Sequence, residues 1–222
     1  MNGEKKFLRA AIFDLDGTLL DSMGLWQDVD REFFGKRGIV MPEDYSTVVA
    51  PMGFPAAAAY TKRHFGLPDD EASIMAEWNA MAMEAYALHV DAKPFAYEYL
   101  SFLAEKGIAV CAATASHTEF WEPALVRLGL LPFFSSVTEI KEVSRGKGFP
   151  DIYLRASEKL GIPPEACAVF EDIPEGVRGA RAGGFYTVGV YDAHNGCEDT
   201  LSALCDRYIH SFSELIAEDV FG

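Results

Sequence analysis

Two aspartates separated by one residue, Asp14 and Asp16, directly follow an apolar run that ends at Phe13. Gly17 and Thr18 then turn the chain away, a pattern typical of a buried strand that ends in a loop. Carboxylates at such a place can bind a hard cation, and one of them can attack a phosphorus or carbon centre. Two ionisable groups side by side repel each other and lose solvation, and a bound cation would offset that cost.

Short apolar runs alternate with amphipathic stretches along most of the chain. This alternation predicts a parallel, doubly wound α/β sheet with helices on both faces. The predicted strands are Arg9–Phe13, Ile108–Ala112, Ser136–Glu139, Ala168–Phe170, Tyr186–Val190 and Tyr208–Ile209. The helices predicted between them are Ala96–Lys106, Glu119–Leu128, Pro150–Leu160 and Glu175–Ala182.

The connection between Ser22 and Lys93 contains no convincing strand and is too long for a simple crossover. Its apolar residues recur at helical spacing, which predicts helices over Met23–Gly35, Phe54–Phe65 and Glu71–Val90. The last of these carries a stripe formed by Ile74, Trp78, Met81, Ala85 and Leu88. We therefore expect a small helical insert over residues 22–92, and a Rossmann-like core made of residues 1–21 and 93–222.

Four further residues follow or flank the other predicted strands. Thr114 follows the second strand, Lys147 precedes a later helix, and Glu171 and Asp172 follow the fourth strand. Ligands of open α/β sheets gather beyond the carboxyl ends of the strands, where the strand order reverses. If the strand order is 3-2-1-4-5, the first and fourth strands are neighbours, and all of these side chains converge with the two aspartates on one crevice.

That set of groups meets the requirements of phosphoryl transfer. Carboxylate oxygens suit Mg²⁺, and a free carboxylate can form an acyl phosphate as nucleophile. A lysine and a hydroxyl can hold the equatorial oxygens of the phosphoryl group and stabilise developing charge. A second carboxylic acid can protonate the leaving oxygen and then deprotonate water.

The stretch FDLDGTLLDS resembles the first motif of the haloacid dehalogenase superfamily of phosphotransferases nearly letter for letter, and the later residues fall in that family's order. The resemblance implies that Asp14 is the nucleophile and Asp16 the general acid and base. It implies Mg²⁺ as cofactor, held by Asp14, the backbone carbonyl of Asp16 and Asp172, with Glu171 a direct or an indirect ligand. The residues implied to bind phosphate are Thr114, Ala115 and Lys147.

The position of the insert, directly after the first motif, resembles the helical-cap subgroup that contains β-phosphoglucomutase and phosphoglycolate phosphatase. The β-phosphoglucomutase members carry a histidine ten residues past the acid/base aspartate, and Trp26 stands at that place. They also place an arginine in the cap, whereas the corresponding stretch here, PMGFPAAAAY, has no basic residue. Trp26 is therefore predicted either to belong to the core of the cap or to face the substrate.

Two local departures from the family pattern concern the neighbours of the site residues. Gly148 follows the lysine where a proline is usual, and Ile173 follows the acidic pair where a small hydroxyl residue is common. Neither removes a catalytic group. The basic run Lys62, Arg63 and His64 in the insert is interpreted as a solvated helix terminus.

The overall charge limits the partners that the protein can bind. Lys plus Arg number 19 and Asp plus Glu number 34, so the formal net charge is −15. This balance argues against nucleic acids and anionic membranes and leaves a small phosphate ester as the expected partner. The four cysteines show no metal or redox spacing and no segment is apolar enough to span a membrane, so we expect a cytoplasmic monomer or weak dimer.

Four functional hypotheses follow, in decreasing order of support. The first is a Mg²⁺-dependent phosphatase that acts on a small sugar or polyol phosphate through an aspartyl phosphate. The second is a sugar phosphomutase like β-phosphoglucomutase. A phospho-accepting signalling module uses a similar carboxylate, threonine and lysine set but needs no acid/base group such as Asp16. A carbon–halogen hydrolase fits least, because Asp16 and the acidic pair suit a metal and a phosphate.

Overall fold

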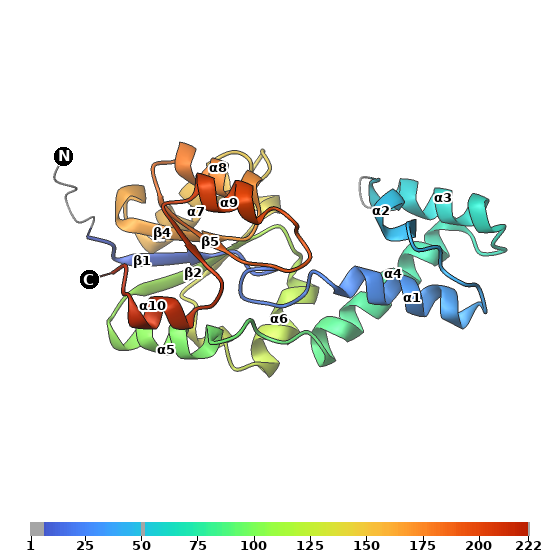
Figure 1. Cartoon of the computed structure of the whole chain (residues 1–222), viewed down its shortest axis with the longest axis horizontal. Coiled ribbons are helices and arrows are strands. Elements are labelled where there is room, and N and C mark those ends of the chain that lie inside the picture. The colour runs from blue at the N-terminus through green and yellow to red at the C-terminus, as the bar shows by residue number, and fades with distance from the viewer. Residues whose placement is uncertain (1–6, 50–51, 222) are drawn as a thin grey trace. The chain divides into compact units, whose positions relative to one another are not determined.

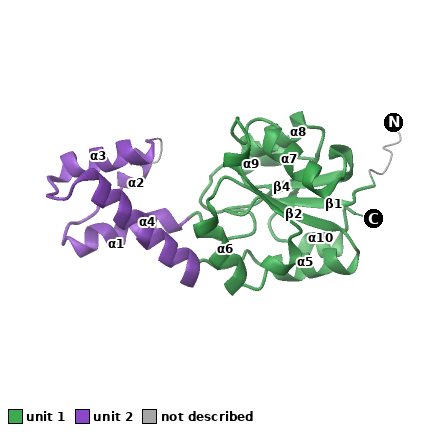
Figure 2. Ribbon diagram, turned by 180° about the vertical axis from the view of Figure 1, so that it is seen from behind, with its two compact units in different colours: residues 1–23, 90–222 green, residues 24–89 purple. Residues whose placement is uncertain are grey.

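A computed structural model of the chain describes residues 7–49 and 52–221. The chain divides into two compact units (Figure 2). Unit 1 contains the residues up to Met23 together with those from Val90 onward, and unit 2 is the segment Gly24–His89. Each unit has its own hydrophobic core.

Unit 1 is built on a six-stranded sheet with the order β3-β2-β1-β4-β5-β6, in which every neighbouring pair is parallel. The predicted α/β class and the predicted 3-2-1-4-5 order are confirmed, and the sixth predicted strand extends the sheet beyond β5. The strands are β1 Ala10–Phe13, β2 Ala109–Thr114, β3 Val137–Glu139, β4 Cys167–Glu171, β5 Tyr186–Val190 and β6 Arg207–Ile209.

Helices cover both faces of this sheet, as expected for right-handed crossovers (Figure 1). Helices α7 and α8 lie on one face, and α5 and α10 lie on the other. No described helix is both long enough and apolar enough to cross a membrane. The helices of unit 1 are α5 Ala96–Glu105, α6 Thr118–Arg127, α7 Asp151–Leu160, α8 Pro174–Ala182, α9 Glu198–Leu204 and α10 Ser213–Ala217, with short 3₁₀ turns at Leu131–Phe133, Ile140–Glu142 and Pro164–Ala166.

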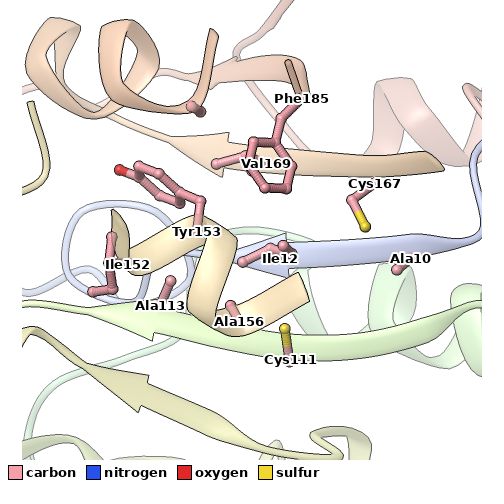
Figure 3. Close-up of a cluster of buried hydrophobic side chains, with 11 residues drawn as sticks. Ala10, Ile12, Cys111, Ala113, Ile152, Tyr153, Ala156, Cys167, Val169 and Phe185 are labelled. Atoms are coloured by element: carbon pink, nitrogen blue, oxygen red, sulfur yellow. The ribbon is translucent and has the colours of Figure 1, made fainter. Parts of the chain in front are cut away.

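The first face of the sheet packs against α7 and α8 (Figure 3). Successive strand residues point to opposite faces, so Ala10 and Ile12 of β1 belong to this cluster. Ile152, Tyr153 and Ala156 of α7 lie over them. Their spacing of one, three and four residues places all three on one side of the helix, which buries that side against the strands.

The second face carries stacked aromatic rings close to the end of β1. Phe13 stacks on Phe170 of β4, with ring centroids 4.2 Å apart. Tyr99 of α5 stacks on Phe212 at 5.4 Å and meets Phe13 edge-on at 6.3 Å. All four side chains are fully buried. This cluster fixes the ends of β1 and β4, from which Asp14, Glu171 and Asp172 follow.

Unit 2 is helical, and its helices surround a second aromatic core. Phe34 meets Tyr45 and Phe65 at centroid distances of 4.8 and 4.6 Å, and Phe33 meets Trp78 at 5.4 Å. The three helices predicted here are present, and a short fourth helix, α2, was not predicted. The helices are α1 Leu25–Lys36, α2 Tyr45–Val49, α3 Phe54–Phe65 and α4 Glu71–Leu88.

The buried stripe of α4 differs from the predicted one in its second half. Ile74, Trp78 and Met81 are buried as predicted, but Leu88 is 57% exposed. Ala82 and Tyr86 are buried in its place. A straight helix has 3.6 residues per turn, so a stripe spaced in steps of four and three drifts away from the packed face over several turns.

The two linkers between the units pair with each other within unit 1. Leu20 and Ala92 form an isolated antiparallel bridge, and the amide of Asp21 donates to the carbonyl of Asp91 at 2.8 Å. The amide of Lys93 donates to the carbonyl of Leu19, also at 2.8 Å. These bonds hold the start and the end of the insert side by side.

The buried carboxyl of Asp30 in α1 predicts a pH dependence of the stability of unit 2. Burial raises its pKa from 3.8 to about 6, against the opposing effects of the Ser46 hydrogen bond and of Arg31. An acid with a raised pKa costs stability once it ionises, so stability is greatest below about pH 4 and falls as the pH rises through about 6. We expect Asp30→Asn to stabilise unit 2 at pH 7, by on the order of 1–2 kcal/mol after solvent screening.

Urea unfolding of the wild type and of Asp30→Asn between pH 4.5 and 7.5 measures this effect. The two proteins should differ little at the acid end and diverge as the pH rises. Asp28→Asn is the matched control, because Asp28 lies on the same helix with its side chain 75% exposed. A constant difference between Asp30→Asn and the wild type across this pH range would contradict the prediction.

Candidate active site

The strand register brings the acidic residues together at the carboxyl edge of the sheet. Phe13 of β1 pairs with Phe170 of β4, and the amide of Asp14 donates to the carbonyl of Phe170 at 3.0 Å. Asp14 therefore lies beside Glu171, the last residue of β4. Thr114 ends β2 on the other side of β1, so the predicted convergence of β1, β2 and β4 is present in the backbone.

Asp14, Glu171 and Asp172 form a buried acidic group. One carboxylate oxygen of each lies within 4.8 Å of the others. The ammonium group of Lys147 contacts Asp14 and, at 2.7 Å, Glu171 Oε1. The sequence predicted all four of these residues, and the structure places them in one cluster.

Burial and mutual repulsion set the protonation behaviour of this cluster. Burial raises the pKa of Asp14 well above its usual range; Glu171, Asp172 and Asp16 raise it further, and Lys147 opposes them. Burial and the neighbouring Glu171 raise the pKa of Asp172 to about 6. For Lys147, burial favours the neutral amine, but the carboxylates of Asp14 and Glu171 prevail and raise its pKa. The raised pKa values of Asp14 and Asp172 reflect three buried carboxyl groups that share a single ammonium group.

The donor set fits a hard divalent cation. Glu171 Oε1 accepts hydrogen bonds from Lys147 and from the hydroxyl of Tyr153, both at 2.7 Å. Within the part of the chain that the structure describes, the other oxygen, Oε2, is buried and has no hydrogen-bond partner. Buried oxygens normally have a partner, and three carboxylates supply the oxygen ligands that Mg²⁺ prefers.

Two features of the structure require glycine at position 17, namely its backbone conformation and the closeness of Asp172. Its φ of +78° is a left-handed conformation that side chains disfavour. A Cβ at this position would lie 2.1 Å from Asp172 Oδ2, so there is no room for one. The hydroxyl of the next residue, Thr18, donates to Asp172 Oδ1 at 3.3 Å. The Gly-Thr pair of the motif thus makes space for Asp172 and also holds it.

Two glycines of α8 leave space for the other side of the cluster. A Cβ at Gly176 would lie 2.3 Å from Glu171 Oε2. A Cβ at Gly179, one turn later, would lie 2.0 Å from the backbone carbonyl oxygen of Lys147. Helix α8 can therefore approach both the acidic group and the lysine loop because these positions lack side chains.

The remaining predicted site residues have the following positions. Thr114 is buried at the end of β2, where its Oγ1 accepts a hydrogen bond from the amide of Ser116 at 3.0 Å, and Ala115 is exposed next to it. The side chain of Asp16 lies outside the acidic group of three and accepts a hydrogen bond from Ser22 at 2.7 Å. Trp26, in unit 2, is 39% exposed and packs edge-on against Phe54.

Besides Thr18, Tyr153 and Asn195 contact the acidic group although sequence reasoning gave them no role there. Tyr153 looked like an ordinary core residue of an amphipathic helix, and its ring does pack in the core (Figure 3). Its hydroxyl nevertheless donates to Glu171. Asn195 lies in the stretch HNGC, which carries no recognisable site motif, yet its amide donates to Asp172. The one available signal in the sequence was that Asp192, His194 and Asn195 follow a predicted strand, Tyr186–Val190.

Comparison with known proteins identifies relatives along most of the chain. A family model described as haloacid dehalogenase-like hydrolase matches residues 8–184. The fructose-1-phosphate phosphatase YqaB of Escherichia coli K12 is 30% identical over 81% of this chain and 94% of its own length. Hexitol phosphatase A of the same organism is 31% identical over 81% of each chain.

A solved structure resembles the whole fold. The crystal structure of a HAD family hydrolase from Deinococcus radiodurans R1, with bound phosphate and sodium, superposes with a TM-score of 0.76. It is 27% identical, and the match covers 96% of this chain and 95% of that one. The resemblance thus extends to both units of the present protein.

The close approach of Gly179 to Lys147 predicts that Gly179→Ala destabilises unit 1. A methyl group would overlap the backbone carbonyl oxygens of Lys147 and Phe149, which cannot move without displacing the lysine loop. We expect a loss of about 1–3 kcal/mol in the free energy of unfolding, as for other overpacking substitutions. Urea denaturation followed by far-UV circular dichroism measures it.

Gly35→Ala is the matched control, because Gly35 lies in α1, is exposed and has no atom near its missing Cβ. In that setting alanine favours the helix, and we expect stabilisation by up to about 1 kcal/mol. Equal stabilisation by both substitutions would contradict the steric role of Gly179.

Proposed function

The chain belongs to the haloacid dehalogenase-like hydrolase family, and from that membership we propose that it is a Mg²⁺-dependent phosphatase of a small sugar or polyol phosphate. The observation that carries the proposal is the buried group of Asp14, Glu171 and Asp172 with Lys147 beside it. These carboxylates lie at the carboxyl ends of the neighbouring strands β1 and β4, which is where open α/β sheets bind their ligands. Such a buried acidic group suits a cation together with a phosphate ester. The phosphatases named above support the reaction type.

Asp14 is the proposed nucleophile and Asp16 the proposed proton carrier. A carboxylate oxygen of Asp14 forms a bond to phosphorus, and the bond from phosphorus to the ester oxygen breaks as Asp16 gives that oxygen its proton. Asp16 then takes a proton from water, whose oxygen attacks the phosphorus of the aspartyl phosphate. The bond between phosphorus and Asp14 breaks, which releases inorganic phosphate and restores both aspartates.

Lys147, Thr114 and Ala115 are the proposed phosphate-binding residues. Lys147 already contacts Asp14, so its ammonium group can attract the equatorial oxygens of a phosphoryl group at that carboxylate. Thr114 and Ala115 lie at the end of β2 and can contribute a hydroxyl and a backbone amide. These groups compensate the charge that a phosphate brings to a protein of net charge −15.

Asp14, Asp172 and the backbone carbonyl of Asp16 would hold the Mg²⁺ ion, with Glu171 as a further direct or indirect ligand. When bound, the cation balances the charge of the carboxylates and of the phosphoryl oxygens. The unpartnered Oε2 of Glu171 and the raised pKa values of Asp14 and Asp172 support this assignment among the described residues.

Residues 22–92 are the proposed cap that selects the substrate. Lids of this kind admit a substrate, exclude water during the reaction and open for product release. Trp26 is the proposed substrate-facing residue of the cap, and its partly exposed ring supports an apolar or stacking contact. The basic residues of α3 lie in its last turn, where they suit the helix dipole, so these residues do not favour a bisphosphate-binding mutase.

The proposed setting is the cytoplasm, with a small phosphate ester as partner. The four cysteines of the described chain are free thiols, which supports a reducing compartment. The negative net charge supports neither nucleic acid nor an anionic membrane as partner. We keep the prediction of a monomer or weak dimer.

The phosphatase proposal predicts release of inorganic phosphate from sugar and polyol phosphates in the presence of Mg²⁺. Screening the purified chain against a panel of such esters tests it, with Asp14→Asn as the decisive variant. Because this substitution removes the nucleophile and keeps the shape, turnover should fall by at least about 10³-fold. Unchanged turnover in Asp14→Asn, or no turnover of any ester by the intact chain, would refute the proposal.

The same panel separates a phosphatase from a phosphomutase. A mutase would interconvert hexose phosphate isomers in the presence of a sugar bisphosphate and release little phosphate. Net release of inorganic phosphate without isomer interconversion would identify a phosphatase. Asp21→Asn is a suitable control for the loss of a carboxylate from the same segment of the chain, because the Asp21 side chain is 52% exposed and lies outside the acidic group. It should retain most of the turnover.

The metal assignment predicts that Mg²⁺ stabilises the folded chain. A ligand that binds only the native state at 100 times its Kd adds about 2.7 kcal/mol. We therefore expect MgCl₂ to raise the melting temperature of unit 1 more than NaCl of equal ionic strength, and EDTA to reverse the shift and abolish turnover. Asp172→Asn should lose the shift, and a shift of the same size in this variant would contradict the assignment.

A further inference from the structure

The loop between β5 and α9, residues 191–197, reaches the acidic group from a strand that carries no predicted site residue. The side-chain amide of Asn195 donates to Asp172 Oδ2 and, at 3.3 Å, to the backbone carbonyl of Asp172. The thiol of Cys197 donates to the same carbonyl at 3.5 Å. The loop therefore holds both the carboxylate and the backbone of Asp172.

Both oxygens of the Asp172 carboxylate are consequently held in place. Thr18 donates to Oδ1, and Asn195 donates to Oδ2. A carboxylate with a donor on each oxygen cannot rotate freely about its Cβ–Cγ bond. The side-chain amide of Asn195 is a neutral hydrogen-bond donor. A lysine or arginine at this position would repel a bound cation, and an aspartate or glutamate would add to the repulsion among the three acids.

The loop is itself anchored to the linker between the units. The side chain of Asp192 is fully buried, and its Oδ1 accepts a hydrogen bond from the amide of His194 at 2.7 Å. The ammonium group of Lys93 pairs with Asp192 Oδ2. Lys93 belongs to the second linker, whose backbone bonds to Leu19. Contacts therefore run from the linker through Lys93 and Asp192 to the backbone of His194, the residue before Asn195.

We propose that Asn195 is a positioning residue for Asp172, and that the Lys93–Asp192 ion pair fixes the loop that carries it. The inference rests on the proposed function, because it takes Asp172 to be a metal ligand. Groups that orient a ligand from outside the coordination sphere typically contribute 10–100-fold to metal affinity. Asn195 acts through Asp172 and has no direct contact with the reacting atoms in this assignment.

The decisive experiment compares Mg²⁺ binding by Asn195→Ala and the wild type, measured by isothermal titration calorimetry on the full chain. We expect Asn195→Ala to weaken Mg²⁺ binding by about 10–100-fold. Because the missing group only orients the ligand, saturating Mg²⁺ should restore most of the turnover. Asn79→Ala is the matched control, because it removes the same side chain from an exposed position on α4 of unit 2. Its Mg²⁺ affinity should stay within about twofold of the wild type.

Lys93→Met tests the anchor, and the sign of its effect is informative. Removing a positive charge near the site strengthens cation binding through electrostatics alone. Weaker Mg²⁺ binding in Lys93→Met therefore supports the anchoring of the loop, and equal or tighter binding overturns it. In the double variant with Asn195→Ala, Lys93→Met should weaken Mg²⁺ binding no further than Asn195→Ala alone does, because the anchoring effect of Lys93 acts through Asn195.

The outcomes distinguish this inference from the proposed function. If the wild type binds no Mg²⁺, the metal assignment fails. If the wild type binds Mg²⁺ and Asn195→Ala binds it within about twofold as well, only the positioning role fails. A lower melting temperature of Asn195→Ala with unchanged Mg²⁺ affinity would assign Asn195 a purely structural role and would also overturn the inference.

Discussion

The burial of three carboxylates beside the ammonium group of Lys147 is the constraint on which the arrangement of unit 1 depends. Two unit charges about 4 Å apart interact by about 4 kcal/mol at an effective dielectric constant of 20, so their repulsion is a substantial fraction of the net stability of a domain, which is about 5–15 kcal/mol. The parallel order of β1 and β4 brings the acids together at one edge. Gly17 and Gly176 leave space around Asp172 and Glu171. The fold thus tolerates a charge excess that a bound cation can balance.

The chemistry and the proposed selection of substrate lie in separate parts of the chain. All residues proposed to act on the phosphoryl group or the cation belong to unit 1, whose sheet is held by its own packed faces. Unit 2 has an independent aromatic core around Phe34 and Trp78. Substitutions on the surface of unit 2 can therefore change what it contacts without disturbing the acidic group. In the same way, changes within unit 1 need not alter the packing of the helices of unit 2.

The sequence predicted the sheet order and the members of the acidic cluster because these depend on local patterns. An apolar run followed by a turn identifies β1, and the convergence of strand ends brings Asp14 and Glu171 together in any sheet of this order. Tyr153 and Asn195 were missed because neither lies in a motif or directly after a predicted strand, and only the folded chain brings them to Glu171 and Asp172. Nothing in the periodicity of α7 separates a core tyrosine from one whose hydroxyl reaches a carboxylate. The glycines of α8 were missed for a similar reason, since their function is the absence of a side chain.

The one-residue spacing of Asp14 and Asp16 has a structural reason in the residue between them. Leu15 is fully buried, and its carbonyl accepts hydrogen bonds from the amides of Leu19 and Leu20, which closes the turn. With Leu15 fixed, Asp14 joins the buried acids, while Asp16 is directed to Ser22 in a more exposed setting. The proposed nucleophile and the proposed proton carrier thus have different environments. Burial raises the pKa of Asp14, and Lys147 beside it, together with a bound cation, would favour the ionised form that a nucleophile needs. A pair of adjacent aspartates, or a pair on a straight strand without this turn, would not separate them in this way.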